Sequence, residues 1–377
     1  MRVDLHRNWL VGTAMLGLCC GAAPEERAVL GEAVVVQKVK FPSTILAADV
    51  DGDGKMDLLL RSDRGLDVLL GDRTGKFRAG PAGAMALPES AGEMVVADVN
   101  KDGKLDVAIA AHNSYAVTIL QGNGAGKFAP MAGSPFVAKK GAHPHTHGLA
   151  LGDVNGDGWL DIVIANSDDG DVSVMLADGK GGFKDGVGFP YGKGAYPIAL
   201  VDVNGDGKLD VAVPNCRTPG SLSILLGDGR GGFSRPNSIA CDERPYFVAV
   251  ADVNGDGRPD FVVAHDDADT ATIFLGDGKG GAVKTEKSPM HLGKRVWQIA
   301  ILEFDGDGKL DFVAAGEDSV RVFLGDGRGG FAAASGSPFR TGKGTWTLAV
   351  ADFNGDKKWD VAASSLESGE VFLLLGK

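Results

Sequence analysis

An acidic nonapeptide recurs seven times along this chain of 377 residues and constrains its fold more than any other feature. The fourth copy reads DVNGDGKLD, and every copy has an acid at positions 1, 5 and 9 and Asp or Asn at position 3. Successive copies start 49 to 55 residues apart. A period of this size is typical of a ring or solenoid built from equal units. The copies occupy residues 49–57, 98–106, 153–161, 202–210, 252–260, 303–311 and 352–360.

Each unit contains short apolar runs separated by glycine-rich turns. In the fourth unit these runs are PIALV (197–201), VAVPN (211–215) and SILL (223–226), followed by a weaker fourth stretch. Short runs rich in β-branched residues and bounded by Gly, Asn and Asp are typical of β-strands. Proline occurs in the fourth stretch of several units, which suits an edge strand. Four antiparallel strands in each of seven units predict an all-β fold, a seven-bladed β-propeller.

The two ends of the repeat region predict that the ring is closed. The seventh unit stops at VFLLLGK (371–377), where its fourth strand should follow, and a spare strand-like segment, VVVQKVKF (34–41), precedes the first unit. We expect this segment to complete the last blade, because an open solenoid would leave unpaired strand edges. The expected propeller spans residues 34–377, after a short linker at 24–33.

The first 23 residues have the order of an export signal. MRVDLHRNW carries two arginines, LVGTAMLGL is an apolar run too short to span a bilayer, and CCGAA offers small residues, with cleavage expected after Ala22. A lipid anchor at Cys19 is the alternative, although Leu18 fits a lipobox poorly. We therefore expect a secreted, periplasmic or cell-surface protein without a transmembrane segment. Cys216 and Cys241 remain after cleavage, and such a pair in an exported chain predicts a disulfide, with two buried thiols as the alternative.

Each acidic loop offers side-chain oxygens at positions 1, 3, 5 and 9 and a backbone carbonyl at position 7. This density of oxygen donors favours Ca²⁺, whereas Mg²⁺ requires tighter geometry and zinc prefers Cys or His. The first half of the loop matches an EF-hand, but position 12 is Leu60 or Val213 rather than Glu, so we expect a calcium loop between two strands. Carboxylates that merely decorate a turn are the alternative, at an electrostatic cost. The predicted ligands are Asp49, Asp51, Asp53, Asp57, Asp98, Asn100, Asp102, Asp106, Asp153, Asn155, Asp157, Asp161, Asp202, Asn204, Asp206, Asp210, Asp252, Asn254, Asp256, Asp260, Glu303, Asp305, Asp307, Asp311, Asp352, Asn354, Asp356 and Asp360.

Up to seven Ca²⁺ ions are expected, and three loops depart from the pattern. Glu303 is one methylene longer than Asp, and Lys101 at position 4 adds no ligand and should be harmless. Lys357 replaces glycine at position 6, where a left-handed backbone disfavours a Cβ, so the 352–360 loop should be the weakest site. The seven loops hold 23 of the 50 acidic residues, so the net charge of −12 mostly reflects metal sites, and it argues against a nucleic-acid partner.

This order of strands and acidic loops resembles the FG-GAP or VCBS repeats, best known from the propellers of integrin α-subunits. The resemblance covers residues 34–377 and includes all seven units. It implies calcium in the loops between strands one and two, all on one face of the disc. It also favours a binding module over an enzyme.

The opposite face should carry the residues that differ between units. Six residues before each acidic loop, five of the seven units have His, Tyr or Trp, and the other two have Ser43 and Gly92. His112 should lie beside the AHPHTHG segment, whose His143, His145 and His147 are expected on one side of an extended chain. That segment is either a solvated loop or a zinc or copper site, and the aromatic residues either pack between blades or bind a ligand. The candidate ligand-binding residues are His112, His145, His147, Tyr196, Tyr246, Arg244, Arg295, Trp297 and Trp346.

Two functions compete for this face. The first is an exported binding module for a glycan or a protein. The second is a polysaccharide lyase with His147 or Tyr196 as its base and Arg244 or Arg295 opposite a uronate carboxylate. A purely structural segment of a surface assembly is a third possibility. The chain has no nucleophile elbow, phosphate loop or HExxH motif, and we assign no catalytic residue.

Overall fold

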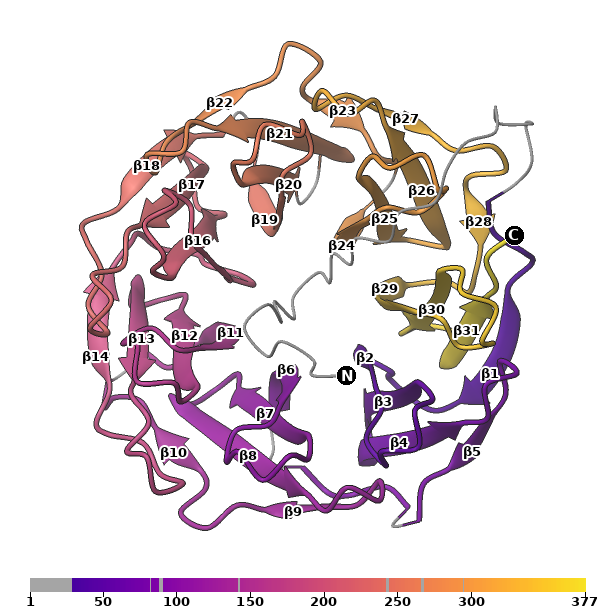
Figure 1. Cartoon of the computed structure of the whole chain (residues 1–377), viewed down its shortest axis with the longest axis horizontal. Helices are drawn as coiled ribbons and strands as arrows, with labels where there is room; N and C mark the ends of the chain where they lie inside the picture. Colours follow the sequence, from indigo (N-terminus) through magenta and orange to yellow (C-terminus); the bar gives the residue numbers. More distant parts are fainter. Residues whose placement is uncertain are drawn as a thin grey trace.

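The computed structural model describes residues 29–377 except 82, 88–90, 142, 242–243, 266–267 and 294. The expected export signal, Cys19 and the first part of the linker lie outside the described residues. In the described part every regular element is a strand, and the strands form seven separate sheets arranged as a ring (Figure 1). The predicted seven-bladed β-propeller is therefore confirmed. No helix that could cross a membrane is found within the described residues.

The blades repeat one antiparallel order, from an innermost strand to an outermost strand. The innermost strands are β2 (Thr44–Ala48), β6 (Ala91–Ala97), β11 (Thr146–Gly152), β15 (Ala199–Val201), β19 (Pro245–Ala251), β24 (Val296–Leu302) and β29 (Thr345–Ala351). The second strands are β3 (Asp57–Ser62), β7 (Asp106–Ala111), β12 (Asp161–Asn166), β16 (Asp210–Asn215), β20 (Asp260–His265), β25 (Asp311–Gly316) and β30 (Asp360–Ser365). Each second strand begins at position 9 of an acidic loop.

The third strands are followed by short outer strands. The third strands are β4 (Gly65–Gly71), β8 (Ala116–Gly122), β13 (Asp171–Met175), β17 (Ser221–Leu225), β21 (Thr270–Gly276), β26 (Ser319–Gly325) and β31 (Glu370–Leu374). The outer strands of blades one, three and four are β5 (Phe77–Ala79), β14 (Val187–Pro190) and β18 (Asn237–Ala240). In blades two, five and six the outer strand is split into β9 (Phe128–Pro130) and β10 (Phe136–Val137), β22 (Ala282–Lys284) and β23 (Met290–His291), and β27 (Phe331–Ala333) and β28 (Phe339–Arg340).

The N-terminal strand β1 (Val34–Lys38) closes the ring as the sequence predicts. It pairs antiparallel with β31, so the last blade has the order β1-β31-β30-β29 (Figure 1). The pairing continues outside these strands, because Leu30 bridges Gly376 and the Gly31 N–H donates to the Leu375 carbonyl at 2.7 Å. The last blade is thus built from both ends of the propeller domain.

The core lies between neighbouring blades. Alternate side chains of a strand point to opposite faces of its sheet, and in a propeller both faces are covered by other blades. Leu59 packs toward Val107 of blade two, whereas Leu58 and Leu60 pack toward Ala362 of blade seven. The second strands are accordingly buried along almost their whole length and read as continuous apolar runs. This packing fixes the positions of the loops at both ends of each blade.

Candidate functional site

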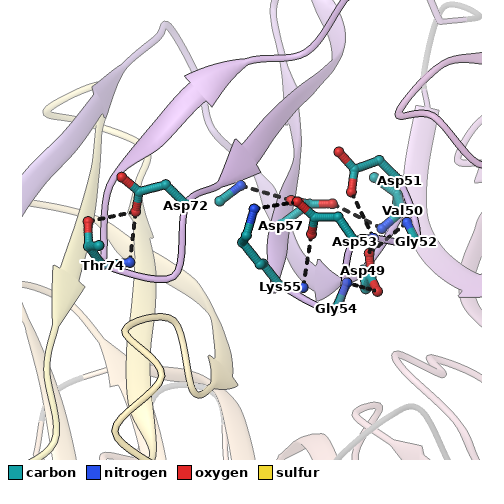
Figure 2. Close-up of polar contacts among 11 residues, drawn as sticks. Asp49, Val50, Asp51, Gly52, Asp53, Gly54, Lys55, Asp57, Asp72 and Thr74 are labelled. Carbon is teal, nitrogen blue, oxygen red and sulfur yellow. Dashed lines mark hydrogen bonds and ion pairs between the residues drawn. The ribbon is translucent and has the colours of Figure 1, made fainter.

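The first half of each acidic loop is a tight turn folded around its position 1 carboxylate. In blade one, Asp49 Oδ1 accepts hydrogen bonds from the N–H groups of Gly52 and Asp53, and Asp49 Oδ2 accepts one from Gly54 (Figure 2). Gly52 and Gly54 have φ of 74° and 78°, which glycine adopts without a Cβ penalty. The Asp51 carboxylate accepts from Asp53 N–H at 3.3 Å. The turn therefore holds three carboxylates together at the solvent-facing side of the loop.

The oxygen atoms of these carboxylates lie close enough to share a cation. Oxygens of Asp49, Asp51 and Asp53 all lie within 4.8 Å of one another, and so do those of Glu303, Asp305 and Asp311. An all-oxygen donor set on a partly exposed turn fits the coordination preferences of Ca²⁺ and does not fit zinc. Like charges at this spacing repel one another, so a bound cation would relieve that repulsion.

In several loops the carboxylate at position 5 forms an ion pair with the lysine at position 7. Lys55 Nζ lies 2.6 Å from Asp53 Oδ2, and Lys309 Nζ lies 2.6 Å from Asp307 Oδ2. Lys208 approaches Asp206 in the same way at 3.2 Å. These position 7 side chains are substantially exposed, and ion pairs between exposed groups add little to stability because solvent screens them. A metal ion would displace an ammonium group from position 5 at a small cost.

Position 9 has a structural role that the sequence analysis missed. Asp57 is 1% exposed, with Oδ2 accepting from Val50 N–H at 3.0 Å and Oδ1 accepting from Gly71 N–H at 2.8 Å. This carboxylate therefore fastens the acidic loop to the end of the third strand. The same pair of backbone bonds and an exposure of 0 or 1% recur at Asp57, Asp106, Asp161, Asp210, Asp260, Asp311 and Asp360.

Burial raises the pKa of these position 9 carboxyls, to about 6 in Asp161 and about 7 in Asp311. The backbone donors act in the opposite direction but do not overcome the loss of hydration. Only the lone pairs left over from the two backbone bonds are available to a metal. Position 9 is Asp in all seven copies, but so is the exposed position 5, so invariance alone does not reveal the structural role of position 9.

Two loops place a lysine in the left-handed region. Lys357 at position 6 has φ of 68°, in agreement with the strain expected there. Lys101 at position 4 has φ of 61°, and position 4 is a glycine with positive φ in the other six loops. The expectation that Lys101 is harmless was therefore wrong, because position 4 requires the same unfavourable backbone conformation as position 6.

On the opposite face, β-bulges present the aromatic residues at the starts of the innermost strands. The pairing of β11 with β12 shifts by one residue between Thr146 and Gly148, which makes His147 the bulged residue. Equivalent shifts in β19, β24 and β29 fall at Tyr246, Trp297 and Trp346. A bulge adds an unpaired residue and re-aims its side chain, and bulges are common beside binding sites.

These side chains form an unbroken series of ring contacts from blade to blade. Tyr196 lies 4.1 Å from Tyr246 between ring centroids, Tyr246 lies 5.1 Å from Trp297, and Trp297 lies 4.2 Å from Trp346. All four are only partly buried. We call these four residues the aromatic arc. The same four rings therefore both pack against neighbouring blades and remain partly exposed to solvent. Blades one and two have no ring at this position, where Ser43 and Gly92 stand.

A histidine cluster adjoins one end of the aromatic arc. His147 lies 4.5 Å from Tyr196, 4.4 Å from His145 and 4.6 Å from His112 between ring centroids. His112 and the two β11 histidines are neighbours, as expected from adjacent blades. His143 is exposed and lies outside this cluster, so the expectation that it shares a side with His145 and His147 was wrong. The local chain is not a regular strand until Thr146, which is why simple alternation fails there.

The charge state of the cluster follows from its surroundings. Burial, and after it repulsion from the imidazolium charges of His112 and His145, lowers the pKa of His147 to about 3. His147 is therefore a neutral imidazole at neutral pH.

Arg244 and Arg295, expected beside the arc, are both exposed. Arg244 Nε donates to the Cys216 carbonyl at 3.2 Å, and Arg295 N–H donates to Asp269 Oδ1 at 2.9 Å.

The cysteines differ from the expected arrangement. Cys216 and Cys241 are both buried, at 7% and 8% exposure, but Cys216 is a free thiol, so the predicted disulfide between them is not present in the structure. The Cys241 thiol is directed at the Ile239 carbonyl, 3.9 Å away, and Cys216 Sγ packs beside Gly194. The two sulfurs therefore have different neighbours.

Comparison with known proteins agrees with the fold. The FG-GAP-like repeat matches this chain six times in overlapping segments, at residues 49–109, 98–164, 153–213, 202–263, 252–313 and 303–363. The chain belongs to the FG-GAP-like repeat family. No curated protein matches it.

Several solved structures share the propeller fold at low sequence identity. An Agrocybe aegerita lectin that recognises non-reducing terminal N-acetylglucosamine is 20% identical, with a TM-score of 0.59 over 88% of this chain and 87% of the lectin. A chain from BBS1N in complex with ARL6DN is 13% identical, with a TM-score of 0.64 over 93% and 97%. An inactive virginiamycin B lyase from Staphylococcus aureus with quinupristin is 11% identical, with a TM-score of 0.57 over 91% and 98%. At these identities the likeness concerns the fold alone.

Proposed function

We propose that this FG-GAP-repeat propeller is an exported binding module that recognises a glycan or protein ligand on the face opposite its acidic loops. The aromatic arc is the observation that carries the proposal. Four partly exposed rings from consecutive blades touch one another and end at a histidine cluster. Seven structurally equivalent positions thus differ in chemistry around the ring, which is what recognition of one ligand in one orientation requires.

A glycan fits this surface best. Aromatic rings offer large apolar faces with fixed geometry, and tyrosine and tryptophan add a polar group at the ring edge. The apolar faces of sugar rings pack on such surfaces, and exposed Arg244 and Arg295 precede Tyr246 and Trp297 by two residues. The lectin with a similar fold shows that a propeller scaffold can serve this purpose, although it says nothing about which sugar this chain would bind.

The lyase alternative gains less support. A general base works best when its pKa lies near the working pH, and that of His147 is lowered to about 3 by burial and by the neighbouring histidines. A shallow hollow of about 530 Å³ on the acidic-loop face, lined by Asn204, Asp206 and the 226–228 and 232–234 segments, is a poor alternative site. Its walls are made of turns that recur in the other blades, so they offer little to distinguish one ligand.

Calcium binding and export complete the proposal. The acidic loops would hold up to seven Ca²⁺ ions, through positions 1, 3 and 5 with help from positions 7 and 9, and the 352–360 loop would be the weakest site. The all-oxygen donor sets and the short spacing of their carboxylates support this assignment. Export rests on the leader at residues 1–23, and mass spectrometry of protein made with its leader should find a new N-terminus near Ala22.

A glycan array probed in Ca²⁺ tests the ligand face. Tyr246→Ala and Trp297→Ala should weaken binding to any glycan identified by about tenfold or more, because each removes a central ring of the arc. Trp159→Lys is the matched control. It removes an indole from the acidic-loop face and gives position 7 the lysine found in neighbouring loops.

The proposal requires a specific pattern of results. Binding should survive Trp159→Lys. All three variants should keep the rise in melting temperature that Ca²⁺ produces in the parent, although the melting temperature itself falls with the loss of ring packing between blades or of the contact between Lys101 Nζ and the Trp159 ring. Binding that survives both arc variants, or that is lost only in Trp159→Lys, would place the ligand on the wrong face for this proposal. Turnover of a bound glycan would instead favour the lyase.

A further inference from the structure

Three imidazole rings from two blades converge at one point beside the aromatic arc. His112 follows β7 of blade two, and His145 and His147 stand at the start of β11 of blade three. Their rings form a triangle with centroid separations of 4.6, 4.6 and 4.4 Å. The cluster is independent of the acidic loops, which lie on the opposite face of the propeller. The ring contacts within the cluster are formed by the protein alone, so this inference does not depend on the proposed glycan ligand.

The ring nitrogens are directed toward a common centre. One nitrogen from each ring lies within 4.8 Å of the others, and His145 Nε2 is 2.8 Å from His147 Nε2. Three nitrogens bound to zinc at roughly 2.0 to 2.1 Å with tetrahedral angles stand about 3.3 Å apart. The His145–His147 separation lies just below that value and the other two do not exceed 4.8 Å, so modest rotations of the partly exposed rings would bring the three nitrogens to it.

The outward nitrogens of two rings already have partners. His145 Nδ1 lies 3.1 Å from Asp168 Oδ2, and Asp168 Oδ1 accepts from Arg217 Nη2 at 2.6 Å. His112 Nδ1 lies 2.9 Å from the side-chain oxygen of Asn113. A carboxylate or amide oxygen on the far nitrogen fixes the tautomer of a metal-binding histidine and raises its basicity. These contacts occupy Nδ1 of His112 and His145 and leave their Nε2 atoms available to a metal, and His147 Nε2 already lies beside His145 Nε2.

The donor set selects the class of ion. Neutral imidazole nitrogens suit zinc, copper, nickel and cobalt, whereas calcium and magnesium require oxygen ligands. Three histidines leave a fourth position open to water or to a bound group, as in catalytic zinc sites. Because His145 remains 32% exposed in its side chain, an ion could enter from solvent.

We propose that His112, His145 and His147 form a three-histidine site for a divalent transition metal of the zinc class. Asp168 is the positioning residue behind His145. The ion would stand at the end of the aromatic arc, because His147 lies against Tyr196. The propeller would then carry two kinds of metal site, with oxygen ligands on one face and nitrogen ligands on the other.

The test uses the untagged chain after removal of the leader, first stripped with chelator and then saturated with Ca²⁺ so that the acidic loops are occupied. Calorimetric titration with Zn²⁺ should show one tight site per chain, and Co²⁺ should give the visible absorption of a nitrogen-bound ion. His145→Ala and His147→Ala should weaken Zn²⁺ binding about 100-fold or more. Asp168→Asn should weaken it by about tenfold while leaving the stoichiometry at one.

Exposed histidines outside the cluster provide matched controls. His143→Ala and His291→Ala should bind Zn²⁺ like the parent, although His143 is only two residues from His145. Absence of a stoichiometric Zn²⁺ site in the parent protein would overturn the proposal whatever the variants do. Binding that survives the His145→Ala,His147→Ala double variant, or that an excess of Ca²⁺ abolishes, would also overturn it.

Discussion

Glu93 and Gln298 occupy equivalent positions in blades two and six. Each lies on the innermost strand of its blade, five residues before the acidic loop. Glu93 Oε2 accepts from the Leu149 N–H at 2.9 Å, and Gln298 Oε1 accepts from the Leu348 N–H at 2.8 Å. Loss of hydration raises the pKa of Glu93 to about 8. The carboxyl group is therefore protonated at neutral pH and links two blades as a glutamine does.

This shift gives Glu93 a defined effect on stability. An unfolded Glu releases its proton near pH 4.3, whereas folded Glu93 keeps it until about pH 8, so the folded state binds the extra proton between these values. The contribution of Glu93 to the free energy of unfolding thus falls as pH rises through that window. Glu93→Gln should change little near pH 5 and should stabilise the protein by about 1 kcal/mol or more at pH 9, measured by urea unfolding in Ca²⁺.

The reciprocal variant is the control. Gln298→Glu should introduce the same pH dependence in blade six and lower stability at pH 9 relative to pH 5. Parallel stability profiles for the parent and Glu93→Gln across pH 5 to 9 would contradict this account of Glu93.

At the scale of one element, an acidic loop combines two tasks. Asp161 at position 9 is fully buried and binds the backbone N–H groups of Val154 and Ala177. Asp157 at position 5 is exposed and faces the proposed Ca²⁺. The first carboxylate holds the loop to its blade whether or not metal is present, whereas the second matters chiefly for binding the ion.

The two tasks should separate on mutation. Asp161→Ala leaves two buried N–H groups without acceptors and should cost about 2 to 4 kcal/mol with or without Ca²⁺. Asp157→Ala should match or exceed the parent in chelator, because it removes a repelling charge. In about 2 mM Ca²⁺ it should lose the roughly 0.6 to 1.8 kcal/mol that one occupied site contributes. Melting curves in chelator and in Ca²⁺ measure both effects, and a melting temperature of the parent that is the same in both would contradict calcium binding.

The sequence predicted the elements better than it predicted their pairing. The fourth unit's run at 211–215 became β16, which begins one residue earlier, and the run at 197–201 became the shorter β15. The split outer strands and the bulges at His147 and Trp297 were not predicted, because register depends on partner strands rather than on local pattern. The existence of the strands and their order along the chain, in contrast, could be predicted because the same local pattern of residues is repeated seven times.

The site shows the same division. Adjacent blades place His112 beside His145 and His147, a neighbourhood that the repeat order alone predicts. The position 9 clamp was missed because its second donor, such as Gly71, lies on another strand 14 residues away from Asp57. The Cys216–Cys241 disulfide was predicted from the expected export of the protein and from the even number of remaining cysteines. Neither observation says in which direction the two thiols point.

At the scale of the whole molecule, closure of the ring depends on the segment that ends with β1. Leu30 is 1% exposed and packs in the same cluster as Phe372 and Leu374 of β31. β1 covers the outer edge of β31, which would otherwise present unpaired N–H and C=O groups. A chain that starts at Val39 should therefore melt at a lower temperature than one that starts at Ala23, and it should self-associate through the open edge.

Lys38→Ala in the longer chain is the control, because it removes only the solvent-screened Lys38–Glu370 ion pair at 2.8 Å and should leave the melting temperature nearly unchanged. Light scattering during size exclusion and melting in Ca²⁺ measure both properties. A synthetic peptide of residues 29–41 should restore the monomer and much of the lost melting temperature, because it supplies Leu30 and the missing ladder in trans. If the truncated chain remains monomeric and melts like the longer one, the remaining six complete blades hold the ring shut without this strand.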